Sequence, residues 1–377
     1  MMKDIVHIMP DDKFIDDFIR MSEKFNHQKS SYIILTLQDP KFVKSENQEV
    51  SIIKVNSNFE LNDEVLHQLN QCKVIILHSF DWKYWAFIEK LSKEIKIIWS
   101  FWGIDGYNAI RKSKYLTKES TMMQYDRSAK GIFKSYVRLV FNYFLLPKQK
   151  ACRNIIRRAD YCATFVKDDL ELVKRINPNI EGLYFTYFNE TGYNLLELSE
   201  PNIDGEVNIL LGNSANPTNE HSLALSYLDK INFKGKIYCP LSYSGTEVYI
   251  NNVIKLGTRL FGDKFIPLTE FLNYKEYSRI ISDCDIVFMN HIRQQAVGNI
   301  FKSISLLKPV ILNNKSYLRS TFLDWGLKIY DLDILSNINL INIDDLKKNR
   351  EIILRILDEN NNLNFFNKIA EISNSEI

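Results

Sequence analysis

The chain has 377 residues, which is long enough for two domains that each bury a core of their own. Its formal net charge of +2 excludes a protein that is basic over its whole surface, so any basic surface must be local. The five cysteines form no CxxC pair and have no histidine nearby, which excludes a zinc site of the usual spacing and fits a reducing cytoplasm.

In the first half of the chain, short apolar runs alternate with segments of helical periodicity. The apolar runs predict strands at residues 5–9, 31–37, 51–55, 73–78, 95–99 and 159–165. Helices are expected at residues 11–25, 82–92 and 168–176. This alternation predicts an open, doubly wound parallel sheet of the α/β class, whose ligands bind beyond the carboxyl ends of the strands. His7, His78 and Asp105 stand at such ends, although either histidine is as well explained as a structural group satisfied inside the fold.

The segment WSFWGIDGY, residues 99–107, carries the densest functional pattern of this half. Two glycines flank Asp105, and Trp102 and Tyr107 supply flat aromatic faces of the kind that stack on sugars. Asp105 is expected to act as a general base or to bind an acceptor hydroxyl. The alternative is a loop in which Asp105 caps a helix and the tryptophans belong to the core.

Residues 111–158 contain thirteen lysines and arginines but only two acids. Lys130, Lys134 and Arg138 recur at four-residue spacing and form one helical stripe. The apolar arc beside this stripe comprises Phe133, Val137, Val140 and Phe144. A basic amphipathic segment predicts a helix on an anionic membrane surface, and the alternative is a helix packed on the sheet with a solvated basic face. Because the N-terminus has no signal-peptide pattern and no apolar run approaches the roughly 18 residues of a spanning helix, we expect a cytoplasmic, peripheral protein.

A polar stretch without periodicity separates the two halves. We expect an N-terminal domain over residues 1–190, a linker over 191–206, a second domain over 207–345, and a C-terminal helix and tail over 346–377. In the second domain, strands are expected at residues 207–211, 236–239, 264–268, 285–290 and 309–312. Helices alternate with these strands, which again predicts a doubly wound parallel sheet.

Two strand–loop–helix turns of the second half are alike. The first runs from residues 207–211 through Gly212 and a polar loop to a helix at Glu220. The second runs from residues 285–290 to a helix that opens at residues 293–295. Each turn places free backbone N–H groups and the positive end of a helix dipole at one spot, so the pair suggests a ligand with a pyrophosphate. The alternative is two ordinary connections in which Asn, Ser and Pro only shape the turns.

Four short motifs carry a resemblance to a known family. They are WGID with a following Tyr107, GNS at residues 212–214, NEH at 219–221, and RQQ at 293–295 with a small residue and Gly298 after it. The chain resembles the lipid-II N-acetylfucosaminyltransferase (4-α-L-fucosyltransferase-like) family of bacterial surface-polysaccharide synthesis, although Gly106 stands where a bulkier residue is common. Members of that family move 4-acetamido-4,6-dideoxygalactose (Fuc4NAc) from a dTDP-sugar to an undecaprenyl-diphosphate-linked saccharide, in polysaccharides of the O-antigen or enterobacterial-common-antigen type.

The resemblance implies a GT-B glycosyltransferase fold, with two facing doubly wound parallel-sheet (Rossmann-like) domains, and a hexosyltransferase that uses no metal and no cofactor. Asp105 and Arg293 are the catalytic candidates, as proton acceptor if the anomeric centre inverts and as the cation that neutralises the leaving diphosphate. The donor-binding candidates are Gly212, Asn213, Ser214, Asn219, Glu220, His221, Tyr243, Glu247, Tyr249, Arg293, Gln294, Gln295, Gly298 and Asn299. The acceptor-binding candidates are His7, His78, Trp102 and Tyr107.

The expected partners are a dTDP-sugar donor, a polyisoprenyl-diphosphate-linked saccharide acceptor and the anionic cytoplasmic face of the inner membrane, with no nucleic acid. Two alternatives stay open. One is a glycosyltransferase that uses another nucleotide-sugar donor, such as a UDP- or GDP-sugar. The other is a non-catalytic nucleotide-sugar-binding scaffold of a polysaccharide assembly complex.

Overall fold

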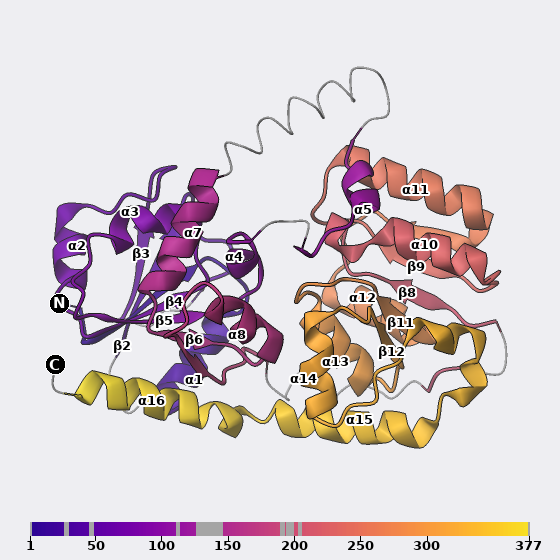
Figure 1. Ribbon diagram of the computed structural model, residues 1–377. Helices are drawn as coiled ribbons and strands as arrows, with labels where there is room; N and C mark the ends of the chain where they lie inside the picture. The colour runs from indigo at the N-terminus through magenta and orange to yellow at the C-terminus, as the bar shows by residue number, and fades with distance from the viewer. Residues whose placement is uncertain are drawn as a thin grey trace. The chain divides into compact units, whose positions relative to one another are not determined.

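The chain forms two compact units, each built around one parallel sheet (Figure 1). The computed structural model describes residues 2–25, 30–44, 49–110, 114–125, 146–188, 193, 200–202 and 206–375. Unit 1 comprises Met1–Arg111, Phe144–Asn189 and Glu359–Ile377. Unit 2 comprises Lys112–Tyr143 and Glu190–Asp358. Each unit therefore contains a segment that is distant from the rest of it in the sequence.

The sheet of unit 1 has seven parallel strands in the order β3-β2-β1-β4-β5-β6-β7. In chain order the strands are β1 (Ile5–Pro10), β2 (Ser30–Thr36), β3 (Val50–Lys54), β4 (Val74–His78), β5 (Lys96–Ser100), β6 (Tyr161–Ala163) and β7 (Glu181–Leu183). The chain order reverses between β1 and β4. Such a reversal is a topological switch point, and ligands of open parallel sheets bind at the carboxyl ends of the strands there.

The helices of unit 1 cover a sheet whose central strands are apolar on both faces, as parallel strands require. They are α1 (Ile15–Phe25), α2 (Asp63–Leu69), α3 (Trp85–Ile88), α4 (Ile104–Tyr107), α7 (Leu146–Arg158), α8 (Lys167–Lys174) and α16 (Leu363–Asn374). Helix α16 lies beside α1 (Figure 1). It buries Phe365 and Phe366 in one core with Phe18 of α1 and Ile5 of β1. The C-terminal segment therefore completes the core of unit 1, although it follows unit 2 in the sequence.

The sheet of unit 2 has five parallel strands in the order β10-β9-β8-β11-β12. In chain order the strands are β8 (Ile209–Leu211), β9 (Ile237–Pro240), β10 (Phe265–Leu268), β11 (Ile286–Met289) and β12 (Val310–Leu312). Its α-helices are α5 (Lys118–Met122), α10 (His221–Lys230), α11 (Glu247–Phe261), α12 (Tyr274–Asp283), α13 (Val297–Ser305), α14 (Tyr317–Asp324) and α15 (Ile343–Ile356). The switch point of this sheet lies between β8 and β11.

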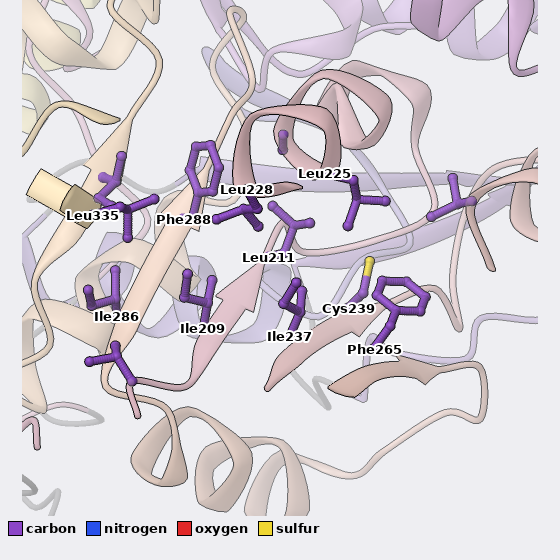
Figure 2. Packing of buried hydrophobic residues seen from close by; sticks show 14 of the residues in the cluster. Ile209, Leu211, Leu225, Leu228, Ile237, Cys239, Phe265, Ile286, Phe288 and Leu335 are labelled. Atoms are coloured by element: carbon purple, nitrogen blue, oxygen red, sulfur yellow. The ribbon is translucent and has the colours of Figure 1, made fainter. Parts of the chain in front are cut away.

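The core of unit 2 fixes the turn that follows β8. Leu225 and Leu228 of α10 lie close to Leu211 of β8 and Phe288 of β11 (Figure 2). All four side chains are fully buried, and burial of one such side chain stabilises the fold by roughly 1.5–3 kcal/mol. Because α10 is anchored on both central strands, its first turn is held at the switch point.

Two predicted helix starts are wrong, each for a local reason. Helix α13 begins at Val297, and residues 293–295 lie in the loop before it, because Ala296 takes a left-handed conformation with φ 59°. Helix α1 begins at Ile15 rather than at residue 11. The Asp11 carboxylate accepts hydrogen bonds from the backbone N–H groups of residues 41–43, which holds it outside the helix.

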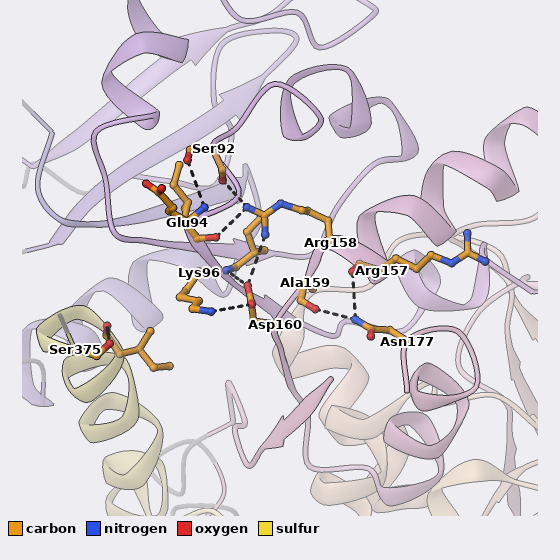
Figure 3. Close-up of polar contacts among 12 residues, drawn as sticks. Ser92, Glu94, Lys96, Arg157, Arg158, Ala159, Asp160, Asn177 and Ser375 are labelled. Carbon is orange, nitrogen blue, oxygen red and sulfur yellow. Dashed lines mark hydrogen bonds and ion pairs between the residues drawn. The ribbon is translucent and has the colours of Figure 1, made fainter. Parts of the chain in front are cut away.

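Part of the basic segment serves the fold of unit 1. Arg158 of α7 donates to the carbonyl oxygens of Ser92 and Ile95 and lies 3.7 Å from Asp160 (Figure 3). Arg153 donates to the carbonyl of Ala109 at 2.9 Å. These two cations join α7 to the segments that precede and follow β5. Not every cation of the basic segment is therefore available to a membrane surface.

The predicted stripe of Lys130, Lys134 and Arg138 and its apolar arc lie outside the described residues. The same holds for most of the predicted linker. Among the helices that the structure describes, none combines the length and the apolar character needed to cross a bilayer.

Candidate active site

Two helix starts of the same unusual kind stand at the switch point of unit 2. Glu220 precedes α10 with φ 55°, and Ala296 precedes α13 with φ 59°, and neither helix has a side-chain cap. A left-handed conformation is uncommon in residues other than glycine and is concentrated at functional sites. Since β8 and β11 are neighbours, the two uncapped N-termini belong to adjacent strand ends, and each presents backbone N–H groups and a positive dipole end to an anion.

A hydrogen-bonded network joins the loops that lead into these helices. Arg293 Nε donates to Thr218 Oγ1 at 3.2 Å, and its terminal nitrogen donates to the carbonyl of Gln294 at 3.1 Å. Thr218 Oγ1 donates to Gln295 Oε1 at 2.5 Å, and Gln295 Nε2 donates to Asn213 Oδ1 at 2.8 Å. The predicted residues of the GNS and RQQ motifs are thus brought together. Sequence reasoning missed Thr218, which a PTN triplet marks only as a turn.

Each loop also carries a buried, neutral histidine. His221 Nδ1 lies 2.9 Å from the Tyr249 hydroxyl, and His291 Nδ1 lies 2.9 Å from the carbonyl oxygen of Arg293. Burial lowers the pKa of each imidazole to about 3, so both are uncharged at neutral pH. Among the described residues, neither Nε2 atom has a hydrogen-bond partner. Buried polar atoms without partners are rare in folded proteins, so these two point to a ligand site.

Glu220 has a role that its place in the NEH motif does not reveal. Its carboxylate accepts from the Thr117 N–H at 2.8 Å, the Thr117 hydroxyl at 2.5 Å and the Ser120 hydroxyl at 2.7 Å. Asn252 of α11 donates to the carbonyls of Met123 and Tyr125 in the same segment. Residues 114–125, the strap, are therefore part of unit 2. No local sequence signal could show this, because Thr117 and Glu220 lie 103 positions apart.

The strap also reaches the cationic side of the site. Tyr115 is buried, and the charge of Arg293 lowers its pKa against the larger rise that burial causes. The tyrosine and the guanidinium are thus close enough to interact. The strap, which Glu220 holds in place, therefore brings Tyr115 close to Arg293.

The other donor-binding candidates are more dispersed. Ser214 accepts from Asn219, and Asn299 on the first turn of α13 donates to the Tyr277 hydroxyl at 3.2 Å. Gly298 lies beside Asn299 on that turn. Tyr243 and Glu247 are exposed, in the loop after β9 and at the start of α11. The structure thus gathers the candidates of the two helix starts and leaves this last pair towards solvent.

In unit 1, His7 and His78 meet at the switch point between β1 and β4. His7 Nδ1 lies 2.9 Å from His78 Nε2, and the second nitrogen of His78 pairs with the Tyr187 hydroxyl. Tyr187 also donates to Ser100 Oγ at 3.0 Å. Both histidines are fully buried, and burial lowers the pKa of His7 to about 3 and that of His78 well below its ordinary value. Tyr187 and Ser100 were not among the predicted residues.

Asp105 lies in α4 and is only 1% exposed. Its Oδ2 accepts from the Trp99 indole N–H at 2.8 Å and from the Trp102 backbone N–H at 3.4 Å. Burial raises the pKa of Asp105 to about 6, although these donors act in the opposite direction. The carboxylate therefore orders the loop that follows β5.

The aromatic candidates of that loop diverge. Trp102 is half-buried and packs edge-on against Tyr187, with ring centroids 5.3 Å apart, and against Phe14 at 6.2 Å. Tyr107 is fully buried, and its hydroxyl donates to Asp169. Trp102 can therefore meet a ligand, whereas Tyr107 is a core residue.

Comparison with known families identifies the family to which this chain belongs. A sequence profile described as "4-alpha-L-fucosyltransferase glycosyl transferase group 56" matches residues 132–371, which is more than half of the chain. The chain belongs to this family. Membership makes it a glycosyltransferase that transfers a hexosyl group, as the sequence motifs predicted.

Solved structures agree in fold at low sequence identity. A glycosyltransferase from Rickettsia africae is 15% identical with a TM-score of 0.61, over 100% of this chain and 99% of that chain. HepE from Anabaena in complex with UDP is 10% identical with a TM-score of 0.61, over 97% and 98%. An α-glucosyltransferase in complex with UDP is 11% identical with a TM-score of 0.52, over 99% and 100%. With the two parallel sheets, these likenesses confirm the GT-B fold class.

Proposed function

We propose that this glycosyltransferase moves a 4-acetamido-4,6-dideoxyhexose of the Fuc4NAc kind from a dTDP-sugar to a polyisoprenyl-diphosphate-linked saccharide, in polysaccharide synthesis of the O-antigen or enterobacterial-common-antigen type. One observation carries the donor half of the proposal. Two uncapped helix starts, Arg293 and two histidine nitrogens that have no partner among the described residues occur together at the switch point of unit 2. Family membership and the UDP-bound relatives support a nucleotide-sugar as the ligand.

The chemistry requires that the leaving diphosphate be neutralised as the glycosidic bond breaks. The N–H groups that open α10 and α13 would bind the phosphate oxygens, and Arg293 would add a fixed positive charge. Thr218 and Gln295 hold the guanidinium and the two loops in register, so the groups need not reorganise during the reaction. Loss of one such charged contact typically costs about 2–4 kcal/mol of transition-state stabilisation.

These groups can act without a divalent metal ion. Among the described residues, no three His, Cys, Asp or Glu side chains lie close enough to share a metal. We therefore expect the rate of transfer in EDTA to equal the rate without chelator. Complete loss in chelator, with recovery on addition of magnesium or manganese, would contradict the metal-free mechanism.

On the acceptor side, we assign Asp105 a positioning role. Its burial and its bonds to Trp99 and Trp102 fit a carboxylate that orders the loop after β5, with Trp102 available to stack on a sugar. Under this assignment Asp105→Asn should raise KM for the acceptor more than it lowers kcat. General bases typically contribute roughly 10²–10⁴-fold to the rate, so a kcat that falls by a factor in this range at unchanged acceptor KM would identify Asp105 as a general base instead.

The basic segment is assigned to the membrane that holds the acceptor. Each cation near an anionic surface contributes roughly 1 kcal/mol, so a few suffice for reversible binding. Neutralising Lys130, Lys134 and Arg138 together should lower co-sedimentation with anionic liposomes and reduce activity on the full-length lipid acceptor only. Arg153 and Arg158 are unsuitable for this test, because they bind backbone carbonyls of unit 1. Unchanged co-sedimentation of the triple variant would contradict a membrane role for the basic segment.

The decisive assay for the proposed function is transfer from dTDP-Fuc4NAc to an undecaprenyl-diphosphate-linked saccharide, with UDP- and GDP-sugars in parallel. The proposal predicts product from the dTDP-sugar and at most slow transfer from the others. Preferential use of a UDP- or GDP-sugar would show that the proposed donor is wrong, while the assignment as a glycosyltransferase would stand. Binding of all donors without transfer to any acceptor would favour a non-catalytic role.

A further inference from the structure

Asn219 and His221 flank Glu220, and both side chains are completely buried. Asn219 Nδ2 donates to the carbonyl of Ser214 at 2.8 Å, which fixes the side chain with Oδ1 on its other side. His221 Nδ1 is engaged by Tyr249, which leaves Nε2 at the opposite edge of the ring. Among the residues that the structure describes, Asn219 Oδ1 and His221 Nε2 have no hydrogen-bond partner. Buried polar groups of this kind need an explanation.

Both atoms lie near one place, the position that a Cβ atom on Gly212 would occupy at the carboxyl end of β8. A Cβ atom on Gly212 would stand 3.1 Å from Asn219 Oδ1 and 3.1 Å from His221 Nε2. Gly212 is held there by its N–H, which donates to the carbonyl of Phe288 at 2.9 Å, and its φ of +70° suits glycine. The absence of a side chain on Gly212 thus lets the two polar atoms converge.

Hydrogen-bond counting identifies which nitrogen of His221 carries the proton. Tyr249 is fully buried, its hydroxyl lies 2.9 Å from His221 Nδ1, and the hydroxyl oxygen also accepts from the backbone N–H of His221. If Nδ1–H donated to Tyr249, the phenolic proton would lack an acceptor and Nε2 would be a bare lone pair. If Tyr249 donates to Nδ1, only the Nε2–H is left to pair. The second arrangement leaves fewer groups unsatisfied, so it is the one that burial favours.

The ionisation states of the two groups support this assignment. Burial lowers the pKa of His221 to about 3, so the ring carries a single proton at neutral pH. Burial raises the pKa of Tyr249 well above its ordinary value, so the phenol keeps its proton. One imidazole N–H and one phenolic O–H are therefore the protons to be placed.

We propose that His221 Nε2–H and Asn219 Oδ1 recognise one hydroxyl group of the bound nucleotide-sugar, and that Tyr249 is a positioning residue that holds His221 in the required tautomer. A hydroxyl oxygen accepts one hydrogen bond and donates another, which is what a donor and an acceptor aimed at one point provide. The inference rests on the proposed function and deepens it. The hydroxyl belongs either to the sugar or to the nucleoside, and the experiment separates these two sources.

The test measures binding of dTDP and of dTDP-Fuc4NAc to the full chain by titration calorimetry. His221→Leu removes the donor, and we expect the Kd for dTDP-Fuc4NAc to rise about three- to tenfold, the effect of one hydrogen bond. His221→Gln places an amide N–H at the same distance along the side chain and should restore most of the affinity. If dTDP alone binds parent and His221→Leu equally, the sugar supplies the hydroxyl. A parallel loss for dTDP assigns it to the nucleoside.

A double-mutant cycle tests the role of Tyr249. Tyr249→Phe should weaken binding in the parent but have no effect in the His221→Gln background, where no tautomer needs to be fixed. Tyr227→Phe, on the same helix as His221, is the matched control and should leave Kd unchanged. Melting temperatures of all variants report folding.

The possible outcomes separate this inference from the proposed function. A Tyr249→Phe loss of equal size in both backgrounds would overturn the tautomer assignment, because it would mark a general structural effect. Unchanged affinities for both ligands in His221→Leu, while the parent binds them, would overturn the recognition pair and leave the donor site intact. Failure of the parent to bind dTDP or any nucleotide-sugar would overturn the proposed donor site, and this inference with it.

Discussion

The two switch points of this molecule share a topology but use it differently. At the β1/β4 switch point of unit 1, both ring nitrogens of His78 are paired, with His7 and with Tyr187, whereas His7 Nε2 has no partner among the described residues. At the β8/β11 switch point of unit 2, His221 and His291 each keep one nitrogen unpartnered among the described residues, beside uncapped helix starts. A switch point alone therefore does not mark an anion site. An unpartnered histidine nitrogen does not mark one either, since His7 has one as well, and what distinguishes unit 2 is the pair of uncapped helix starts together with Arg293.

The most direct test of this difference between the two switch points is a substitution at Arg293. Arg293→Ala should lower kcat/KM by about 30- to 10³-fold, because a fixed cation that stabilises the leaving diphosphate contributes about 2–4 kcal/mol. Arg259→Ala, on the exposed side of α11, is the matched control and should retain full activity. Steady-state kinetics with a saturating acceptor measure both. Near-parent activity in Arg293→Ala, with an unaltered melting temperature, would exclude Arg293 from the chemistry.

The second prediction concerns the strap, which is part of unit 2. Glu220→Ala should lower the free energy of unfolding by about 2–3 kcal/mol, because the three strap donors lose a buried, charged acceptor. Glu351→Ala, an exposed residue of α15, should change it by less than about 0.5 kcal/mol. Urea unfolding with Thr117→Val as the partner mutation gives the coupling energy. Additive effects of Glu220→Ala and Thr117→Val would show that the strap contact contributes nothing.

The third prediction uses pH, since both switch points contain buried neutral histidines. Histidine binds protons near pH 6.5 in the unfolded chain, but His7, His221 and His291 do so only near pH 3 in the fold. The unfolded state thus holds more protons between these values, and the free energy of unfolding falls as pH drops through 6.5, by up to about 1.4 kcal/mol per histidine and pH unit. Asp105, with a pKa raised to about 6, opposes this trend as a single group. Urea midpoints that stay constant or rise from pH 7.5 to pH 5.5 would contradict the assignment.

The smallest expected effect is that of a substitution at the unit 1 switch point, which should change stability and leave donor binding unaltered. Tyr187→Phe removes the hydroxyl that pairs with His78 and Ser100, and should lower the free energy of unfolding by about 1 kcal/mol. Donor Kd should not change, because Tyr187 belongs to unit 1. Tyr161→Phe is the control for loss of a phenol in the same unit. A several-fold rise in donor Kd for Tyr187→Phe would place the donor nearer unit 1 than we propose.

The sequence predicted most strands of both sheets because parallel strands buried on both faces are written as short apolar runs, as in Val74–His78. It missed β7 (Glu181–Leu183), whose three residues are not buried and form no apolar run. It predicted the two turns of unit 2 because Gly212 and polar residues interrupt such runs. It misplaced the start of α13, since the left-handed conformation of Ala296 leaves no mark in the residue type. Local pattern thus finds the elements and not the exact helix termini.

Contacts between residues that are far apart in the chain could not be predicted from a single sequence. Glu220 looked like a ligand contact, yet its carboxylate binds the strap, whose Thr117 lies in the other half of the chain. Residues 363–374 fall in the predicted C-terminal helix and tail, but no local pattern assigned them to unit 1, because Phe365 and Phe366 meet their partners only in the core of that unit. The unpartnered nitrogens of His221 and His291 likewise become visible only when every other hydrogen bond is placed.

Hydrogen–deuterium exchange with dTDP-Fuc4NAc is the most direct test of the central claim, that unit 2 binds the donor at its helix starts. We predict slower exchange in peptides that contain residues 221–223 and 297–299, because we propose that the diphosphate binds at these two helix starts. Exchange at the unit 1 switch point, residues 7–14 and 78–82, should stay unchanged under donor alone. Protection of the unit 1 peptides with no change at the starts of α10 and α13 would contradict this claim.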